Sequence, residues 1–432
     1  LSQDFSDPDV IRVGEDYYLT ASSFNLLPGL PVLHSRDLVH WRIISHGIQR
    51  LPDARHRSRR REEGTFAYDV PRPGMGVYAP CLRYHDGRFW IFWADPDGGV
   101  YQVNATDPHG PWSEPVLVWD HIGIIDPSPL WDEATGKAYL SFAYARSRIG
   151  FNSKIDVIEM RYDGTGVIGE PVEVFTVDRE RYPADRRHSV IEGTKFLQRG
   201  GWYYLLCPAG GVAYGWQTAL RARHPLGPYE IRTVMETGDT GVNGPHQGGL
   251  VDTPNGDWWF LHFQATGTLG RIVRMQPARW VDGWPVIGAD PDGDGIGNPV
   301  GSHAAPLPVH EVALQRSDTF SGDALGLQWQ WPANPQDGWA RLADGFLEMP
   351  VQTAPDARLN ELPAVLTQMF PGVAFTATVK LDVAANGPAA RAGLVALGER
   401  SFDLGVTRDG EAQTLSVRFE TTELDAVTIP RE

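Results

Sequence analysis

Cysteine is scarce in this sequence: its 432 residues include two, Cys81 and Cys207. They lie far apart and belong to no Cys-x-x-Cys or Cys/His spacing, which excludes the common zinc sites and a disulfide framework. We expect both to be buried free thiols. Long apolar runs are lacking too, because none reaches the roughly 18 residues that a membrane-spanning helix needs. The sequence therefore predicts a protein without a membrane partner.

Basic residues are outnumbered by acidic ones. The sequence has 38 Lys and Arg against 54 Asp and Glu, which gives a formal net charge of -16. A nucleic-acid-binding protein presents a basic surface to phosphates, so this balance excludes a polynucleotide partner. The first residue is Leu1 rather than methionine, which favours a secreted or periplasmic protein whose signal was removed, with a cytoplasmic protein as the alternative. The oligomeric state is not indicated.

Glycine, proline and aromatic residues, by contrast, are abundant. There are 47 glycines, 34 prolines, 17 phenylalanines, 15 tryptophans and 14 tyrosines. Glycine and proline supply turn conformations, and aromatic side chains favour half-buried strand positions. Helical periodicity is scarce, which argues against alternating strands and helices. We expect an all-β chain, and its length favours more than one domain.

One pattern, a polar turn followed by an aromatic-rich apolar strand, occurs five times. The copies are VGEDYYLTAS, YHDGRFWIFWA, DEATGKAYLSFA, LQRGGWYYLLC and DTPNGDWWFLHF, beginning at Val13, Tyr84, Asp132, Leu197 and Asp252. A period of roughly 50 to 70 residues leaves room for a four-stranded sheet, which is typical of a propeller blade. The repeats therefore predict a five-bladed β-propeller.

Polar residues stand at matching positions a few residues upstream of these repeats. Three are carboxylates (Asp7, Asp126 and Glu192), one is an imidazole (His246), and the remaining repeat has Ala79 followed by proline. The innermost strand of each blade lines the central channel of a propeller. We therefore expect these side chains to converge on one end of the axis.

Three converging carboxylates have two chemical uses. They could bind a cation such as calcium, which favours several oxygen ligands. They could instead hydrolyse a glycosidic bond, with one acid, one base that activates water, and a third group that raises the pKa of the acid. Taken singly, each has a plainer interpretation as a turn residue. In the Asp-Pro-Asp turn, for example, either Asp7 or Asp9 could be a cap.

Several segments together resemble glycoside hydrolase family 43, in particular its β-xylosidase and α-L-arabinofuranosidase members. They are SDPDVIRVGEDYYLTASSFNLLPGLPVLHSRDLVHW, VYAPCLRYHDGRFWIFW, IIDPSPLWDEATGKAYLSF, IEGTKFLQRGGWYYLL, GPHQGGLVDTPNGDWWFLHF and LGRIVRMQPARW. The resemblance extends from Leu1 to about Pro299. It implies a five-bladed propeller of inverting enzymes, in which Asp7 is the general base, Asp126 the pKa modulator and Glu192 the general acid.

The resemblance also implies four residues around the sugar. Phe24 and Tyr78 match aromatic walls of the pocket, and Arg271 matches an arginine that binds sugar hydroxyls. His246 matches a histidine beside a calcium ion in several relatives, although one imidazole alone indicates a hydrogen-bonded channel histidine. Tyr78 stands where many β-xylosidases have Trp, and Ile272 where many have Glu. The choice between xylose and arabinofuranose therefore stays open.

An Asp-x-Asp-x-Asp-Gly run, with Asp290, Asp292 and Asp294, is similar to the start of a calcium loop. Its twelfth position is Gly301 rather than a bidentate glutamate, so the pattern favours a surface turn over a structural calcium site. We expect the Pro-rich segment that follows, residues 297–311, to be a linker across the propeller surface.

The C-terminal part of the sequence has a different pattern. In FTATVKL, the apolar residues Phe375, Ala377, Val379 and Leu381 alternate with polar ones, which predicts a half-buried strand. This region resembles the β-sandwich behind many family 43 β-xylosidases, although it is shorter than that module and is either reduced or incomplete. We expect a propeller catalytic domain at residues 1–305 and a sandwich accessory domain at residues 306–432.

The sequence thus predicts an exo-acting inverting glycoside hydrolase. Its expected products are xylose, arabinofuranose or both, released from hemicellulose oligosaccharides or side chains such as those of arabinoxylan and xyloglucan. No cofactor is required by this chemistry, and calcium near His246 stays open. The alternative from another class is a non-catalytic carbohydrate-binding propeller. A sialidase-like propeller is disfavoured because recurrent Ser-x-Asp-x-Gly-x-Thr-Trp turns are missing.

Overall fold

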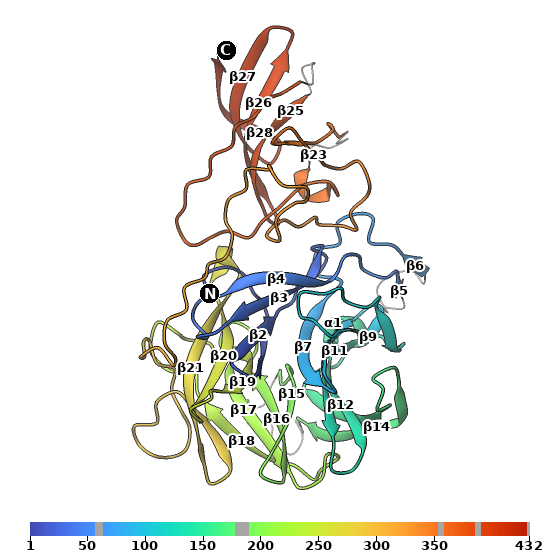
Figure 1. Cartoon of the computed structure of the whole chain (residues 1–432), viewed down its shortest axis with the longest axis vertical. Coiled ribbons are helices and arrows are strands. Elements are labelled where there is room, and N and C mark those ends of the chain that lie inside the picture. Colours follow the sequence, from blue (N-terminus) through green and yellow to red (C-terminus); the bar gives the residue numbers. More distant parts are fainter. Residues whose placement is uncertain (57–63, 178–189, 353–357, 385–389, 430–432) are drawn as a thin grey trace.

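The structure of the protein is a computed structural model that describes residues 1–56, 64–177, 190–352, 358–384 and 390–429. Strands dominate this part of the chain (Figure 1). Its helices are the four-residue α1 (Arg146–Ile149) and two 3₁₀ turns, η1 (Gly267–Leu269) and η2 (Leu359–Glu361). Among these helices, none has the length and apolar character needed to cross a membrane. The predicted all-β fold is confirmed.

Antiparallel sheets of four strands follow one another along residues 9–287, with the strands of each sheet in chain order. The first sheet contains β1 (Asp9–Val13), β2 (Asp16–Thr20), β3 (Gly29–Ser35) and β4 (Arg42–Ile48). The second contains β7 (Tyr78–His85), β8 (Arg88–Asp95), β9 (Gly99–Ala105) and β10 (Val116–Trp119). The third contains β11 (Ile124–Asp132), β12 (Lys137–Tyr144), β13 (Lys154–Met160) and β14 (Val167–Thr176). A separate short pair, β5 (Ala54–His56) and β6 (Gly64–Phe66), lies between the first two.

Two further sheets complete the body of the molecule. The fourth contains β15 (Lys195–Arg199), β16 (Trp202–Ala209), β17 (Trp216–Ala222) and β18 (Glu230–Met235). The fifth contains β19 (His246–Asp252), β20 (Trp258–Ala265), β21 (Arg271–Val281) and β22 (Trp284–Ile287). The sheets contact one another in a ring around their first strands: β1 touches β7 and β19, β7 touches β11, β11 touches β15, and β16 of the fourth sheet touches β19. The sheets therefore surround a common axis, with their first strands innermost, as in a propeller.

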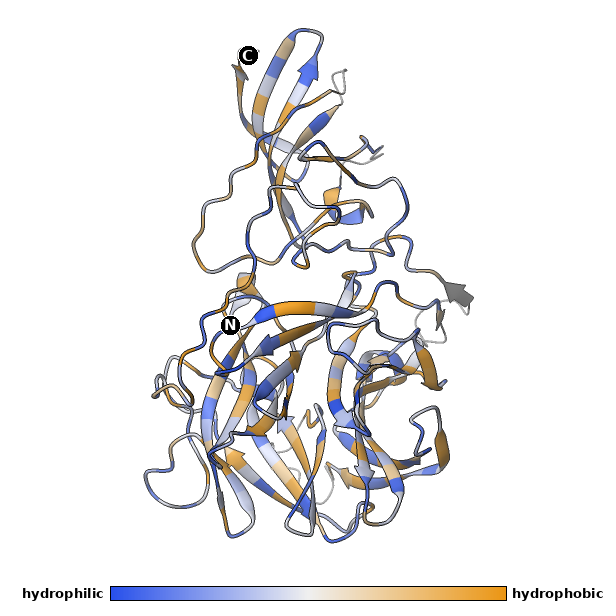
Figure 2. Cartoon of the chain, in the orientation of Figure 1, coloured by the Kyte–Doolittle hydropathy of each residue, from blue (hydrophilic) through white to orange (hydrophobic). Residues whose placement is uncertain are grey.

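Each sequence repeat forms the hairpin that joins the first two strands of a sheet. The paired strands are β1 with β2, β7 with β8, β11 with β12, β15 with β16, and β19 with β20. Apolar residues recur along the strands of the sheets (Figure 2), and the second strands β8, β12 and β16 are buried over most of their length. Aromatic residues of the hairpin strands fill the spaces between sheets, as Tyr17 and Trp259 do in the cluster between the first and fifth sheets. Cys81 and Cys207 are buried free thiols, as expected.

Arg83 joins the first strands of four sheets. From β7, its Nη1 donates to Asp9 Oδ2 at 2.8 Å, and its Nη2 donates to Ser128 Oγ at 3.0 Å and to the Phe196 carbonyl at 3.2 Å. The amide of Leu82 also donates to Asp9 Oδ2, at 2.8 Å. The carboxylate of Asp9, the rival of Asp7 in the Asp-Pro-Asp turn, is therefore occupied in holding the propeller together.

The chain beyond the fifth sheet first runs along the propeller surface, as expected for the linker. Val300 exchanges hydrogen bonds with the side chain of Gln276 on β21, its N–H donating at 2.7 Å and its carbonyl accepting at 3.3 Å. Further on, the amide of His310 donates to Asp37 Oδ2 at 2.8 Å. The strands that follow are β23 (Arg341–Ala343), β24 (Phe346–Glu348), β25 (Arg391–Leu397), β26 (Ser401–Asp409), β27 (Ala412–Phe419) and β28 (Thr422–Ile429). The last four form one antiparallel sheet.

The prediction of a strand at FTATVKL was wrong. Residues 373–384 form no strand. Phe375, Val379 and Leu381 were expected to be buried, but 49%, 45% and 40% of their surface is exposed. A strand needs a neighbour that accepts and donates its backbone hydrogen bonds. In the described part of the chain this segment pairs with no neighbour, and alternation of side chains alone does not supply one.

A short stretch of the C-terminal part docks beside the first sheet. Trp331 and Leu27 exchange backbone hydrogen bonds of 2.6 and 2.8 Å, and Asn25 Nδ2 donates to the Pro332 carbonyl at 2.6 Å. The buried amide of Asn334 pairs with the backbone of Leu51, accepting at 2.8 Å and donating at 3.0 Å. These contacts fix the loop that directly follows Phe24.

Candidate active site

A left-handed backbone residue marks the start of every innermost strand. These residues are Asp7 (φ 54°), Ala79 (φ 36°), Asp126 (φ 57°), Gly193 (φ 62°) and Gln247 (φ 41°). Positive φ is uncommon outside glycine, and such strain gathers at functional sites. On β7, β11 and β19 the pairing register shifts at this point, as in a β-bulge that re-aims a side chain. Asp7, Ala79 and Asp126 are themselves these left-handed residues, whereas Glu192 and His246 each directly precede one. The predicted upstream positions therefore lie at the same backbone feature but differ by one residue.

Asp7 is buried and both of its carboxylate oxygens are engaged. Ser22 Oγ donates to Oδ2 at 2.7 Å, and Arg271 Nη1 donates to Oδ1 at 2.9 Å. Ser22 Oγ in turn accepts a hydrogen bond of 2.8 Å from the amide of Ala79. The carboxylate is therefore held in one orientation by contacts that link the first, second and fifth sheets.

Asp126 is buried on β11 and faces the backbone of the next sheet. The amide of Gly193 donates to its Oδ2 at 2.6 Å. Burial raises the pKa of Asp126 to about 6 against the effect of this hydrogen bond, and the negative charge of Asp7 raises it further. Because Gly193 follows Glu192 in the chain, this hydrogen bond also fixes the backbone that carries Glu192.

The pKa of Glu192 is raised more strongly than that of Asp126. Burial, followed by the negative charges of Asp126 and Asp7, raises its pKa to about 8, against the opposing charge of Arg271. Its side chain still keeps 20% of its surface exposed. Glu192 therefore holds a proton at neutral pH and can present it to a bound molecule, which is what a general acid requires.

Arg271 and His246 complete the polar group. The carboxylate of Asp7 is the main cause of the raised pKa of Arg271, whose guanidinium carbon lies 4.8 Å from the ring centroid of Phe263. His246 is fully buried, and burial, followed by the charge of Arg271, lowers its pKa to about 3, so its ring is neutral. Its Nε2 lies 3.7 Å from Glu192 Oε1. Five predicted residues, drawn from four sheets, thus form one electrostatic group.

Phe24 and Tyr78 form an aromatic pair, and Tyr78 packs against the buried cluster that contains Ile125 and Ile191, the chain neighbours of Asp126 and Glu192. The rings of the pair meet edge to face, with centroids 5.4 Å apart and planes at 82°. The backbones of Phe24 and Val77 also exchange two hydrogen bonds, of 3.1 and 2.9 Å. The structure therefore brings the two predicted pocket walls into direct contact.

Family models account for most of the chain. The model described as glycosyl hydrolases family 43 matches residues 1–285. The chain belongs to this family. A second model, the beta xylosidase C-terminal concanavalin A-like domain, matches residues 317–431. The fold is therefore a family 43 propeller followed by a β-sandwich domain, and the protein is a glycoside hydrolase rather than the non-catalytic binding propeller considered as the alternative.

Relatives of the family 43 enzyme are similar over nearly its whole length. A putative beta-xylosidase of Xylanibacter ruminicola is 42% identical over 94% of this chain and 72% of its own length. A non-reducing end alpha-L-arabinofuranosidase of Bacteroides ovatus is 30% identical over 94% of this chain and 74% of its own. The solved structure of a xylan beta-1,4-xylosidase from Bacillus halodurans superimposes with a TM-score of 0.78 at 25% identity, covering 100% of this chain and 84% of that one.

Three further residues contribute to the family 43 site and were not predicted from the sequence. Ser22 orients Asp7, the amide of Gly193 binds Asp126, and the positive charge of Lys195 lowers the pKa of Asp126. Lys195 is itself buried and donates to the Pro80 carbonyl at 3.0 Å. A lysine at the start of a buried strand is unusual, so the sequence does contain a signal for Lys195. Nothing in the sequence around Ser22 or Gly193 indicates that either contacts a carboxylate.

The surroundings of His246 do not fit a tightly held calcium ion. Both buried ring nitrogens lack a hydrogen-bond partner among the described residues, which leaves room for water or an ion. Calcium takes six to eight oxygen ligands. The contacts of His246 offer one carboxylate oxygen, that of Glu192 at 3.7 Å. No step of the chemistry below depends on a metal.

The three aspartates of the Asp-x-Asp-x-Asp-Gly run lie close together. Ligand oxygens of Asp290, Asp292 and Asp294 lie within 4.8 Å of one another. Asp290 Oδ2 is ion-paired with Arg279 at 2.7 Å, and its Oδ1 accepts the Gly293 amide at 3.0 Å. These are the contacts of a surface turn, and we assign no metal to it.

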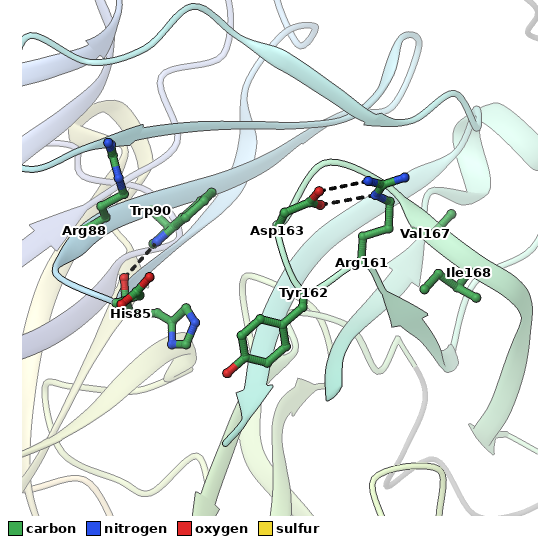
Figure 3. Close-up of a pocket in the computed structure, with 9 residues that line it drawn as sticks. His85, Arg88, Trp90, Arg161, Tyr162, Asp163, Val167 and Ile168 are labelled. Carbon is green, nitrogen blue, oxygen red and sulfur yellow. Dashed lines mark hydrogen bonds and ion pairs between the residues drawn. The ribbon is translucent and has the colours of Figure 1, made fainter. Parts of the chain in front are cut away.

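A groove of about 890 Å³ lies on another part of the enzyme, between the β7–β8 hairpin and the β13–β14 turn (Figure 3). Tyr78 is the first residue of β7, and His85, which lines the groove, is the last residue of that strand. The groove is therefore at the opposite end of this strand from the candidate site. Its two arginines have partners, since Arg161 binds Asp163 at 2.9 Å and Arg88 binds Asn104 at 2.8 Å.

Proposed function

We propose that the protein is an exo-acting, inverting glycoside hydrolase that releases xylose, arabinofuranose or both from hemicellulose oligosaccharides or side chains. One observation carries the proposal: Glu192 holds its proton at neutral pH, next to a carboxylate, Asp7, that is oriented by Arg271 and Ser22. An acid and a base of this kind are the two groups that inverting hydrolysis of a glycosidic bond requires.

The proposed reaction is a single displacement. Glu192 donates its proton to the glycosidic oxygen as the bond from that oxygen to the anomeric carbon breaks. A water molecule attacks the anomeric carbon from the opposite face of the sugar and gives its proton to Asp7. The leaving sugar thus departs as a neutral alcohol, and the released pentose carries the water oxygen with inverted configuration. Burial, followed by the charges of Asp126 and Asp7, keeps Glu192 protonated until substrate binds.

Exo action is supported by the closed inner end of the propeller. Arg83 lies among the first strands of four sheets, where it binds Asp9, Ser128 and Phe196. A polysaccharide chain therefore cannot pass along the axis at this point, which agrees with a site that takes a chain terminus or a branch tip. The names of the relatives, which include a non-reducing end arabinofuranosidase and several beta-xylosidases, agree with this proposal.

The proposal is tested by the anomeric configuration of the first product. We expect proton NMR during hydrolysis of nitrophenyl β-D-xylopyranoside to show α-xylose before mutarotation, because inversion at a β-linkage gives the α-anomer and the leaving group is not itself a sugar. The assay is run with excess chelator and repeated on arabinofuranosyl-xylo-oligosaccharides. Initial appearance of β-xylose would contradict the inverting mechanism. Loss of turnover in chelator would show that the reaction depends on a metal. Release of no pentose from either substrate would contradict the proposed substrate class.

The pH dependence of wild type and Asp126→Asn tests the coupling of the carboxylic acids. We expect kcat/KM of wild type to fall about tenfold per pH unit above a pKa of about 8, because the acid form of Glu192 is then lost. Asp126→Asn removes a negative neighbour, so the pKa of Glu192 falls and this alkaline limb moves to lower pH. The measurement is the pH–rate profile of kcat/KM on xylobiose.

Asp163→Asn is the matched control for that profile. Asp163 is an exposed aspartate paired with Arg161 at the groove, away from the carboxylic acids of the site. Its neutralisation should leave the alkaline limb where it is in wild type. An alkaline limb that does not move in Asp126→Asn, or that moves to higher pH, would show that Asp126 does not raise the pKa of Glu192.

A further inference from the structure

The aromatic wall at Tyr78 is supported from behind by a carbonyl group. The hydroxyl of Tyr78 donates to the Gly74 carbonyl, while its ring meets the edge of Phe24. Gly74 has φ 74°, a left-handed conformation that orients this carbonyl. The position of the Tyr78 ring therefore depends on what holds the Gly74 loop.

Arg148 holds that loop. This arginine belongs to the short helix α1, and its Nη2 donates to the same Gly74 carbonyl at 3.0 Å. Its guanidinium carbon also lies 5.9 Å from the centroid of the Tyr78 ring. Such a distance is within the range of a cation–π contact. Arg148 therefore contacts Tyr78 in two ways, directly over the ring and through the carbonyl that both share.

Asp97 fixes the guanidinium of Arg148. Its Oδ2 accepts from Nη2 at 2.8 Å and from Nε at 3.1 Å, and its side chain is 3% exposed against 17% for Arg148. A buried Arg–Asp pair with two donors on one carboxylate has little freedom to rotate. The amide of Asp97 donates to Asp95 Oδ1 at 2.9 Å, and Asp95 Oδ2 accepts from the hydroxyl of the buried Tyr68 at 2.5 Å. The pair is thus built into the core of the second sheet.

We propose that Arg148, held by Asp97, is a positioning residue that keeps Tyr78 against Phe24 and thereby sets the preference of the enzyme between pentopyranose and pentofuranose substrates. This inference rests on the proposed function. A pyranose and a furanose ring differ in shape rather than in the bond that is broken, so a displaced wall changes the fit of one ring more than the other. Neither Arg148 nor Asp97 takes part in the proton transfers.

Two variants and their combination test the inference. Arg148→Met keeps much of the side-chain volume and removes the charge and the donors. On nitrophenyl β-D-xylopyranoside and α-L-arabinofuranoside we expect it to change the ratio of the two kcat/KM values by about tenfold, chiefly through KM, because small displacements of a positioning group have effects of this order. In a Tyr78→Ala background the same substitution should change the ratio by less than about twofold, because the residue through which it acts is gone.

The controls separate positioning from stability and from the proposed function. Arg161→Met removes an arginine with a similar aspartate pair at the groove and should leave the ratio unchanged. Asp97→Asn should reproduce the effect of Arg148→Met, and Arg148→Lys should restore part of the wild-type ratio. An unchanged ratio in Arg148→Met, or an equal change with and without Tyr78, would overturn the inference while pentose release by wild type continued. Failure of the proposed function would instead appear as wild type without activity on either substrate.

Discussion

Replacing Glu192 by glutamine is expected to lower kcat/KM on xylobiose by about 100- to 10,000-fold, the usual contribution of a general acid. The loss should be much smaller on nitrophenyl β-D-xylopyranoside. Nitrophenolate leaves without help from a proton, whereas a sugar alkoxide does not. Parallel assays of the two substrates therefore measure the role of Glu192 as a proton donor rather than its presence alone.

Stability provides the internal control for Glu192→Gln. The pKa of Glu192 is raised in the folded enzyme to about 8 from an ordinary value of 4.5, so its contribution to stability is greatest at low pH and is lost as pH rises through about 8. Glutamine is neutral at every pH, so the variant should be at least as stable as wild type in weakly alkaline buffer. Glu230→Gln, a change at the outer strand β18, should leave both assays unaffected. Equal losses on the two substrates would contradict the role of general acid.

Replacing Asp7 by asparagine is expected to lower kcat/KM by about 100- to 10,000-fold on both substrates. The base acts on the attacking water, so the loss of activity on removing it does not depend on the leaving group. The single amide oxygen of asparagine can accept from Arg271, and its NH2 group can donate to Ser22 Oγ in place of the bond that Ser22 donates to Asp7, so the side chain keeps two partners. Kinetics on xylobiose and on the nitrophenyl xyloside thus distinguish the Asp7 variant from the Glu192 variant.

Asp9→Asn is the matched control for Asp7→Asn, two residues along the same turn. Asp9 is paired with Arg83 at 2.8 Å, and the side chains are 2% and 19% exposed. Removing one member of a buried pair leaves the other charge without its partner and typically costs about 3 to 5 kcal/mol in the free energy of unfolding. We expect reduced stability in Asp9→Asn and nearly normal kinetics in the folded fraction. The reverse result, with Asp9 essential and Asp7 dispensable, would exchange their assignments.

The hairpins and the upstream polar positions could be predicted because their signals are local. A turn such as His-Asp-Gly-Arg between His85 and Arg88, followed by an aromatic strand, specifies a hairpin within about ten residues. The same backbone unit recurs in every propeller sheet, so residues near one offset from it reach one end of the axis, although Glu192 lies one residue earlier than the position that Asp7 and Asp126 occupy. Asp7, Asp126 and Glu192 were therefore found from spacing before any contact between them was known.

Contacts between distant parts of the chain left no such signal. Asn334 binds the backbone of Leu51 across 283 positions, and Arg83 binds the Phe196 carbonyl across 113. Nothing near either residue indicates its partner. The prediction for the FTATVKL segment failed for a related reason. Its alternating pattern indicates which side chains would share one face of a strand, but it does not indicate which strand would pair with it. Local pattern thus located the catalytic candidates, while the residues that hold them were visible only in three dimensions.

The guanidinium of Arg83 at the meeting point of the innermost strands also bears on how successive turnovers are linked. Because Arg83 closes the axis among the described innermost strands, we expect the released pentose and the shortened chain both to leave through the mouth by which the substrate came in. The shortened chain blocks the departure of the sugar behind it until it dissociates. We therefore expect non-processive hydrolysis, with one sugar removed per encounter and free pentose acting as a competitive inhibitor.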